Sequence, residues 1–289
     1  MPGYLPPYKT FCARFEKPIV QDEDANAVRR LNQFTGPFIL RRMKSEVLRE
    51  LPPKTENVRR VELETEQRKL YLAAVVDARE KLRAAKPEDK MTVFAVLMRL
   101  REICCDPRLV ADNWTGSSAK LEACLELVTE AVAGGHRILL FSQFTSMLEL
   151  LAKRLDEAGV SHFTLQGSTP KPVRAEQVRR FNQGEADVFL ISLRAGGTGL
   201  NLTAADIVIH YDPWWNLAAQ NQATDRAYRI GQRNPVQVYR LIAQDTIEEK
   251  IVELQQAKQS LADTVTGGAD GAILSMNPEQ LLQLLGEEA

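Results

Sequence analysis

The 289-residue sequence has few of the residues that build metal sites and disulfide frameworks. Its three histidines, His136, His162 and His210, are far apart, and its four cysteines include no CxxC pair. Metal ligands usually come in close pairs, so we expect no metal site, and we expect free thiols in a reducing compartment. No apolar run reaches the roughly 18 residues that a membrane span needs, and no leader sequence is evident. We therefore expect a cytoplasmic protein that does not bind membranes.

The sequence also lacks an excess of charge of either sign. Its 37 Lys and Arg residues stand against 38 Asp and Glu residues, which gives a net charge of −1. Any nucleic-acid-binding surface must therefore be local. Two segments are locally basic: residues 37–60 have seven basic and three acidic side chains, and residues 221–240 have four arginines and one aspartate.

Short apolar runs alternate with helical segments over the second half of the chain. Residues with high β-propensity form runs at 138–141, 162–165, 188–192, 206–211 and 236–243. Strands that are apolar throughout and separated by helices are typical of a parallel sheet covered on both faces. We therefore predict an α/β fold with a doubly wound parallel sheet.

The segments around this region predict helices and a connector. Residues 1–20 are rich in proline and aromatic residues, which favours an irregular packed segment, and residues 22–35 predict a short helix. The basic, proline-containing stretch at 37–54 has the composition of a stiff connector. Helical periodicity then predicts a hairpin of two helices up to residue 105, and a further helix after residue 246.

The segment Gln222–Gln232, QATDRAYRIGQ, places Arg226 and Arg229 three residues apart. On a helix these two positions share a face, so two planar, permanently charged guanidinium groups are predicted to point at the same place. Such a pair can bind a polyphosphate. Arginines on helices more often form surface salt bridges, but the glutamines and Asp225 beside these two favour the phosphate-binding interpretation.

Loops that follow the predicted strands contain small hydroxyl residues and glycines. Open parallel sheets bind ligands at the carboxyl ends of their strands, and backbone N–H groups of such loops bind phosphates without reading base sequence. The candidates for contact with a nucleic-acid backbone are Ser142, Gln143, Gly167, Ser168, Thr169 and Arg194. The hydroxyl residues could instead cap helices. Gly197 and Gly199 could form a dinucleotide-binding turn, although their spacing is not GxGxxG.

Two adjacent tryptophans, Trp214 and Trp215, follow Asp212-Pro213. Both could belong to the core, yet neighbouring residues rarely bury on the same face. We therefore predict that one of them lies at the surface, where an indole ring can stack on a base or sugar.

Together these motifs resemble those of the Swi/Snf-type, helicase-related DNA translocases. QATDRAYRIGQ resembles the last signature motif of that family, and SLRAGGTGLNLTAADIVIHYDPWWN resembles the motif before it, with Trp215 as the exposed tryptophan. ILLFSQFTSMLELL and LQGSTP are similar to two earlier motifs of the second lobe. Three other segments resemble further parts of the family: the inter-lobe connector (FILRRMKSEVLRELPPK), the helical insertion (CCDPRLV) and the brace helix (DTIEEKI). The alanine-rich helices and short insertion are typical of bacterial members.

The resemblance implies a machine of two RecA-like lobes that binds ATP with Mg²⁺ between the lobes and moves along double-stranded DNA. The first lobe of the family supplies the Walker A lysine and the DExH acids, and this sequence contains neither motif. The nearest match, Asp156-Glu157-Ala158-Gly159, ends a helical pattern and lacks the histidine. We therefore expect the chain to be the second, C-terminal lobe with the tail of the first, and to be inactive as an ATPase alone.

The resemblance also implies a division of the chain and a role for each candidate residue. The expected parts are the tail of the first lobe at 1–36, the connector at 37–64, the helical insertion at 65–115, the RecA-like lobe at 116–245, and the brace helix with C-terminal tail at 246–289. Arg226 and Arg229 would be arginine fingers that reach the γ-phosphate, positioned with the help of Gln222. The residues near the nucleotide would be Gly197, Gly199 and Asp225. The residues that hold the DNA backbone would be Ser142, Gln143, Gly167, Ser168, Thr169, Arg194 and Trp215.

The implied partners are double-stranded DNA and the first lobe, and a DNA-bound protein or RNA polymerase is a further candidate. We expect the protein in the cytoplasm, associated with the nucleoid. One alternative is a non-catalytic nucleic-acid-binding or protein-binding module with the same fold. Another is a Rossmann-type oxidoreductase, which would need a GxGxxG turn and an acidic residue about 20 residues further on.

Overall fold

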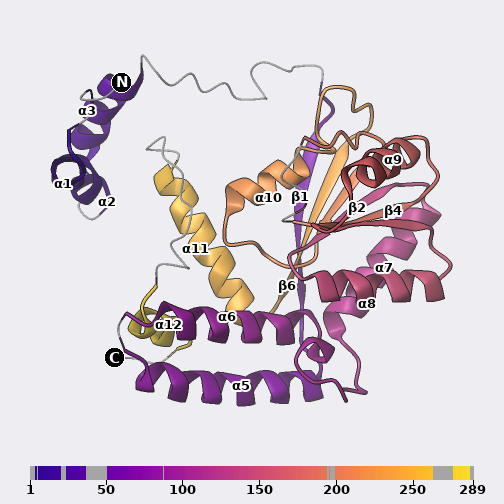
Figure 1. Cartoon of the computed structure of the whole chain (residues 1–289), viewed down its shortest axis with the longest axis horizontal. Coiled ribbons are helices and arrows are strands. Elements are labelled where there is room, and N and C mark those ends of the chain that lie inside the picture. Colours follow the sequence, from indigo (N-terminus) through magenta and orange to yellow (C-terminus); the bar gives the residue numbers. More distant parts are fainter. Residues whose placement is uncertain are drawn as a thin grey trace. The chain divides into compact units, whose positions relative to one another are not determined.

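The computed structural model describes residues 4, 6–20, 24–36, 51–86, 88–193, 195, 199–262 and 276–286. The chain divides into two compact units, Met1–Arg49 with Leu254–Ala269 and Glu50–Glu253 with Asp270–Ala289 (Figure 1). Within the described ranges, no helix is both long and apolar enough to cross a bilayer. All of the candidate site residues belong to the second unit, which we call the larger unit.

The N-terminal part of the smaller unit consists of short helices. Their bounds are α1 (Tyr8–Phe11), a π-helical stretch (Cys12–Glu16), α2 (Lys17–Val20) and α3 (Ala25–Thr35). Phe15 and Ile19 pack with Ala27 and Leu31 of α3 in a small apolar core. The short helix expected at 22–35 is confirmed from residue 25 onward. The expectation of an irregular segment at 1–20 is wrong from residue 8 onward, because Phe11, Phe15 and Ile19 recur at helical spacing.

Six parallel strands form the sheet of the larger unit, in the order β1-β6-β5-β2-β4-β3. Their bounds are β1 (Lys54–Val61), β2 (Ile138–Ser142), β3 (His162–Leu165), β4 (Val188–Ser192), β5 (Ile207–His210) and β6 (Val236–Ala243). Every residue of β2, β4 and β5 is buried, as expected of central strands in a covered parallel sheet. All five predicted strands are confirmed.

Helices cover both faces of this sheet. Side chains of α7 (Ala119–Ala133) and α8 (Thr145–Glu157) pack in one core with Leu140 of β2. Phe181 of α9 (Lys171–Asn182) and Ala223 of α10 (Leu217–Thr224) pack in a second core with Phe141 of β2. Because successive residues of a strand point to opposite faces, β2 contributes to both cores. The predicted α/β, doubly wound fold is confirmed.

Strand β1 lies inside the segment that we predicted to be a connector. It pairs in parallel with β6 along its whole length, from Lys54 opposite Val236 to Val61 opposite Ala243. Its residues are mostly exposed, as at a sheet edge, and charged side chains along it form ion pairs. The polar composition of this edge strand hides it from pattern analysis. Residues 37–50 of the predicted connector lie outside the described residues.

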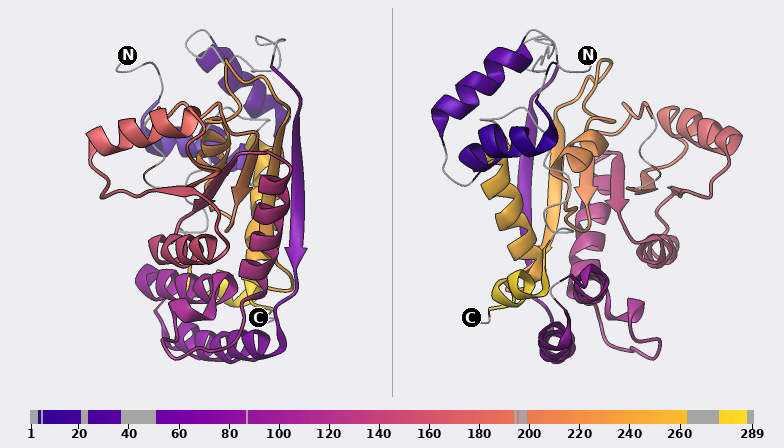
Figure 2. Two further views of the ribbon diagram at one scale, coloured as in Figure 1. Left: turned by 90° about the vertical axis from the view of Figure 1, so that its right-hand side faces the viewer. Right: turned by 60° about the vertical axis from the view of Figure 1, so that its left-hand side comes forward.

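The predicted helical hairpin is present as α5 (Thr65–Ala84) and α6 (Lys90–Cys105), which lie side by side (Figure 2). A short 3₁₀ turn (Pro107–Leu109) leads from α6 toward α7. After β6, α11 (Ile247–Ala262) begins where the brace helix was predicted, and α12 (Pro278–Leu284) packs against α5 and α6.

Candidate functional site

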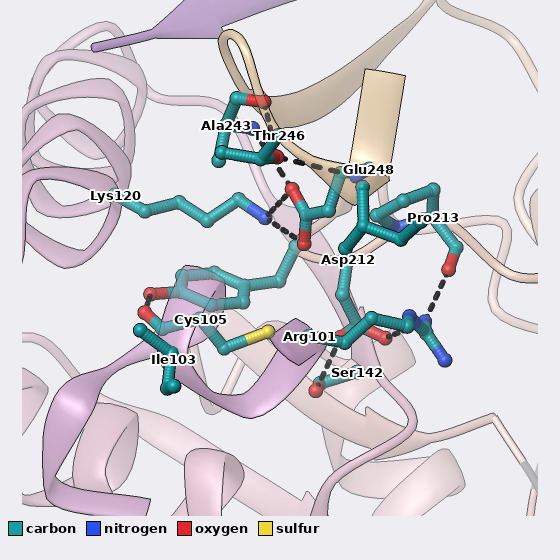
Figure 3. Close-up of polar contacts among 12 residues, drawn as sticks. Arg101, Ile103, Cys105, Lys120, Ser142, Asp212, Pro213, Ala243, Thr246 and Glu248 are labelled. Atoms are coloured by element: carbon teal, nitrogen blue, oxygen red, sulfur yellow. Dashed lines mark hydrogen bonds and ion pairs between the residues drawn. The ribbon is translucent and has the colours of Figure 1, made fainter. Parts of the chain in front are cut away.

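Asp212 joins the loops that follow two neighbouring strands, β2 and β5 (Figure 3). The carboxylate is fully buried and accepts hydrogen bonds from the Ser142 hydroxyl at 2.6 Å and from the Gln143 backbone N–H at 3.3 Å. Burial raises the pKa of Asp212, and the charge of Arg101 with the Ser142 hydrogen bond offsets part of this shift. The two loops are therefore held together at the carboxyl edge of the sheet, where parallel sheets bind ligands.

Arg101 of α6 completes this arrangement from the helical hairpin. Its fully buried guanidinium donates to the Pro213 carbonyl at 2.5 Å and lies 3.4 Å from Asp212 Oδ2. The same group lies 4.0 Å from the centroid of the Trp215 ring. Sequence analysis missed Arg101, although one signal was available: it is the only charged residue on the otherwise apolar buried face of α6.

A second buried ion pair lies beside the first. Lys120 of α7 and Glu248 of α11 are both fully buried, and the Lys120 Nζ lies 2.6 Å and 2.5 Å from the two carboxylate oxygens (Figure 3). Glu248 also accepts the backbone N–H of Ala243 at 2.8 Å. This pair fastens the start of α11 to the sheet and to α7.

Arg226 and Arg229 do not lie on a helix, contrary to the prediction, because α10 ends at Thr224 and turns follow. Arg226 is 5% exposed, and its Nε has no hydrogen-bond partner among the described residues. Arg229 is exposed. Burial lowers the pKa of Arg226, the charge of Arg229 lowers it further, and Asp225 offsets only part of the shift. The two guanidinium groups thus form a positive site that an anion would stabilise.

The two glutamines that bound the motif differ in environment. Gln222 is exposed on α10, whereas Gln232 is buried. The Gln232 amide donates to the Ala205 carbonyl at 2.7 Å and to the Ala227 carbonyl at 3.2 Å. Its oxygen accepts two backbone N–H groups, each at 2.9 Å. Gln232 therefore holds the turn in place, and Gln222 is open to a ligand.

The remaining nucleotide candidates are partly described. Asp225 is half-buried and lies at the C-terminal cap of α10. Gly199 is exposed and has a φ of 32°, and no atom of the described residues lies within 4 Å of where a Cβ would stand. Gly197 and Arg194 lie outside the described residues.

The structure separates the predicted DNA-contacting residues into exposed and buried groups. Gly167 and Ser168 are exposed after β3, and Thr169 is half-buried, with its hydroxyl accepting the N–H of Gln166 at 3.0 Å. Ser142 is fully buried and bonded to Asp212, so its hydroxyl is not open to a ligand, contrary to prediction. The neighbouring Gln143 is half-buried.

The tryptophan prediction is only partly right. We expected one of the two rings, that of Trp215, to lie at the surface, but Trp214 and Trp215 are both half-buried. Trp215 lies between Arg101, Phe94 of α6 and Trp214, with ring centroids 6.5 Å and 6.4 Å from the latter two. Each ring keeps a part of its surface accessible to a partner.

His210 contacts the end of the helix that precedes the arginine motif. Its Nε2 lies 2.9 Å from the hydroxyl of Thr224, the last residue of α10, and its ring stacks on Phe141. Burial, together with the positive charges of Arg240 and Lys54, lowers the pKa of His210 to about 3. The imidazole is therefore neutral near pH 7, where it supports the end of α10.

Comparison with known proteins identifies the class that this fold and site define. Residues 119–231 match the helicase conserved C-terminal domain, and residues 1–109 match the SNF2-related domain. The chain belongs to the Swi/Snf-type, helicase-related family.

Its relatives include bacterial and eukaryotic proteins. The chain is 38% identical over 285 residues to an uncharacterized ATP-dependent helicase of Mycoplasma pneumoniae, covering 98% of this chain and 27% of that protein. It is 37% identical to the SWI/SNF-related matrix-associated actin-dependent regulator of chromatin subfamily A member 1 of Mus musculus, covering 84% of this chain and 24% of that protein. The chain thus spans about a quarter of the length of these relatives.

Solved structures agree with the RecA-like fold. The Sulfolobus solfataricus SWI2/SNF2 ATPase core in complex with double-stranded DNA is 31% identical, with a TM-score of 0.69, and the match covers 100% of this chain and 62% of that chain. The C-terminal domain of the Sulfolobus ATPase is 27% identical, with a TM-score of 0.67, covering 82% of this chain and 100% of that chain.

Proposed function

We propose that the chain is the second motor lobe of an ATP-dependent, double-stranded DNA translocase. In this role it supplies two arginines to ATP that a first lobe binds, and it holds the DNA backbone. The match of residues 119–231 to the helicase C-terminal domain supports the assignment to the second lobe.

One observation supports the nucleotide half of the proposal most strongly. Arg226 is almost completely buried, its Nε lacks a partner within the described part of the chain, and a second cation, Arg229, lies close enough to lower its pKa. Asp225 offsets only part of the cost of burying this cation, and a further anion would offset the rest. A phosphate group has both the charge and the acceptor geometry that two guanidinium groups match.

The residues around this pair complete the proposed nucleotide site. The exposed amide of Gln222 would position the arginines or a water molecule, and Gly197, Gly199 and Asp225 would lie beside the nucleotide. When bound, ATP supplies the phosphoryl group that is hydrolysed, and Mg²⁺ would be held mainly by the first lobe with the phosphates. Arg226 and Arg229 would neutralise charge that develops on the phosphoryl oxygens in the transition state.

The DNA half of the proposal rests on the loops at the carboxyl edge of the sheet. The exposed Gly167 and Ser168 present backbone N–H groups, and Thr169, Gln143 and Arg194 would add polar contacts to phosphates. The accessible part of the Trp215 ring would contact the sugar-phosphate backbone. Ser142 would contribute indirectly, by holding its loop through Asp212. That the Sulfolobus relative was solved with double-stranded DNA supports this choice of partner.

The cellular setting follows from the proposed substrate. A DNA translocase of this kind would act in the cytoplasm at the nucleoid, on DNA that can also carry bound proteins or RNA polymerase. The alternative, a non-catalytic nucleic-acid-binding or protein-binding module, does not explain why two cations are placed together with one of them buried.

The test replaces each of two exposed arginines in the full-length protein, which joins this chain to a first lobe. Arg229→Ala should lower DNA-stimulated ATP turnover by about 10³-fold or more, the usual contribution of an arginine finger. DNA affinity should change little. The matched control is Arg233→Ala, which removes an exposed arginine four residues away and should leave turnover unchanged.

Two results would contradict the proposal. Equal turnover of the Arg229→Ala and Arg233→Ala proteins would exclude the phosphate role of Arg229. A loss of DNA affinity without a loss of turnover would show that Arg229 contacts DNA and not the nucleotide. The 289-residue chain alone should hydrolyse no ATP in the presence of duplex DNA. Activity of the isolated chain would refute the need for a first lobe.

A further inference from the structure

The buried guanidinium of Arg101 is energetically demanding. Burial lowers the pKa of Arg101, the Asp212 charge offsets part of this shift, and in the described structure its Nε and Nη1 have no hydrogen-bond partner. A buried ion pair is often no more stabilising than apolar residues of similar size. Packing of α6 against the sheet therefore does not explain why an arginine stands here.

The contacts of Arg101 explain why an arginine is present at this position. The guanidinium bonds to Asp212 and the Pro213 carbonyl, and it lies 4.0 Å from the centre of the Trp215 ring. One rigid, planar group thus restrains three of four consecutive residues in the loop after β5. A desolvated cation over an indole face is among the stronger cation–π contacts, so it favours one orientation of the ring.

The restraint extends to the neighbouring loop through Asp212. The other carboxylate oxygen accepts the Ser142 hydroxyl at 2.6 Å and the Gln143 N–H, so the loops after β2 and β5 share one anchor. That anchor is provided by α6, which belongs to the helical hairpin and not to the sheet layers (Figure 3).

We infer that Arg101 is a positioning residue for DNA: it orients the Trp215 ring and the loop of Gln143, so that the helical hairpin controls how firmly this lobe holds the DNA backbone. The inference rests on the proposed function and adds a residue and an element to it. Arg101 itself is fully buried and touches no DNA.

The first experiment is a double-mutant cycle on duplex binding by the 289-residue chain, measured by anisotropy of a fluorescein-labelled DNA duplex. Arg101→Lys keeps the charge but loses the planar fork, and it should weaken binding about tenfold, or about 1.4 kcal/mol. Arg99→Lys, the same change at an exposed position of α6, should have no effect. In a Trp215→Ala background, Arg101→Lys should cost little more, because contacting residues are non-additive.

The second measurement follows the ring directly. In a chain whose only tryptophan is Trp215, through Trp114→Phe and Trp214→Phe, Arg101→Lys should raise the acrylamide quenching constant about twofold as the cation–π contact is lost. A variant with Arg101→Met and Asp212→Asn removes both buried charges, which guards against misfolding. It should keep the wild-type circular dichroism spectrum and show the same loss of DNA affinity.

The outcomes separate this inference from the proposed function. If the wild-type chain binds no duplex DNA, the DNA half of the proposed function is wrong and the inference falls with it. If the wild-type chain binds but Arg101→Lys binds equally well, or its effect adds fully to that of Trp215→Ala, only the inference is overturned. Unchanged acrylamide quenching of Trp215 would also overturn it.

Discussion

Breaking the buried Lys120–Glu248 pair should destabilise the larger unit more than breaking an exposed ion pair such as Arg154–Glu122. Both side chains are fully buried, and the Lys120 ammonium makes contacts of 2.6 Å and 2.5 Å with the carboxylate. Removing one partner of such a pair leaves an uncompensated charge in the core, which costs about 3–5 kcal/mol. For a unit of this size, that loss lowers Tm by about 6–20 °C.

The variants Lys120→Met and Glu248→Gln test this expectation by urea unfolding and thermal denaturation. Each single variant should lose the full amount, whereas the double variant should lose less than either single one because neither charge remains. The amide oxygen that Glu248→Gln introduces can still accept the Ala243 N–H. The matched control is Glu122→Gln, which breaks the exposed pair with Arg154 at 2.9 Å and should cost less than about 1 kcal/mol.

The pair should also carry a pH signature. Burial alone would lower the pKa of Lys120, but the charge and hydrogen bonds of Glu248 outweigh it, so the pKa is raised from 10.5. A lysine with a raised folded-state pKa contributes stability that is fully present below the unfolded pKa and is lost as pH rises through the folded value. The stability difference between wild type and double variant should therefore be constant up to about pH 10 and shrink above it. A single variant as stable as wild type, or a double variant less stable than both singles, would refute this reasoning.

Two further predictions concern His210, which contacts Thr224 of the arginine motif, and the two glutamines at the ends of that motif. Because the pKa of His210 is lowered to about 3 from 6.5, its contribution to stability is present above pH 6.5 and is lost as pH falls toward 3. The loss in unfolding free energy reaches about 2 kcal/mol at pH 5. Urea unfolding of His210→Gln at pH 7 and pH 5 should not show this loss. If the variant lost as much stability as the wild type between these pH values, His210 would not be its source. Gln232→Ala should lower the free energy of unfolding by about 2–3 kcal/mol, because it leaves buried backbone groups unpaired. Gln222→Ala should change the same quantity by no more than about 0.5 kcal/mol. Equal unfolding free energies of the two variants would contradict these assignments.

The sheet was predictable because its strands are apolar and buried on both faces. Short apolar runs such as 188–192 that alternate with helical segments are typical of such strands, and both their positions and their parallel arrangement are confirmed. Strand β1 was not predictable in this way, because an edge strand needs only one neighbouring strand to pair with and tolerates charged side chains. Its pairing with β6 depends on a contact between residues far apart in the sequence.

The candidate site was predictable in composition but not in geometry. The motif pointed to Arg226 and Arg229, yet the turn after Thr224 that separates them from α10 depends on tertiary contacts such as that of Gln232 with Ala205. Local spacing cannot reveal that a side chain is buried against a distant loop. For the same reason the sequence alone could not reveal that the Ser142 hydroxyl is bonded to Asp212, 70 residues away, and is not open to a ligand.

The pairing of β1 with β6 has a consequence for how the chain folds during synthesis. Of the six strands of this sheet, β1 is synthesised first, but its ladder partner lies about 180 residues later, at Val236–Ala243. Closing so long a loop carries an entropic cost, and such non-local pairing slows folding. The edge of the sheet can therefore form only after the arginine motif has been translated, and a chain that ends before β6 leaves β1 with its backbone hydrogen bonds unmade.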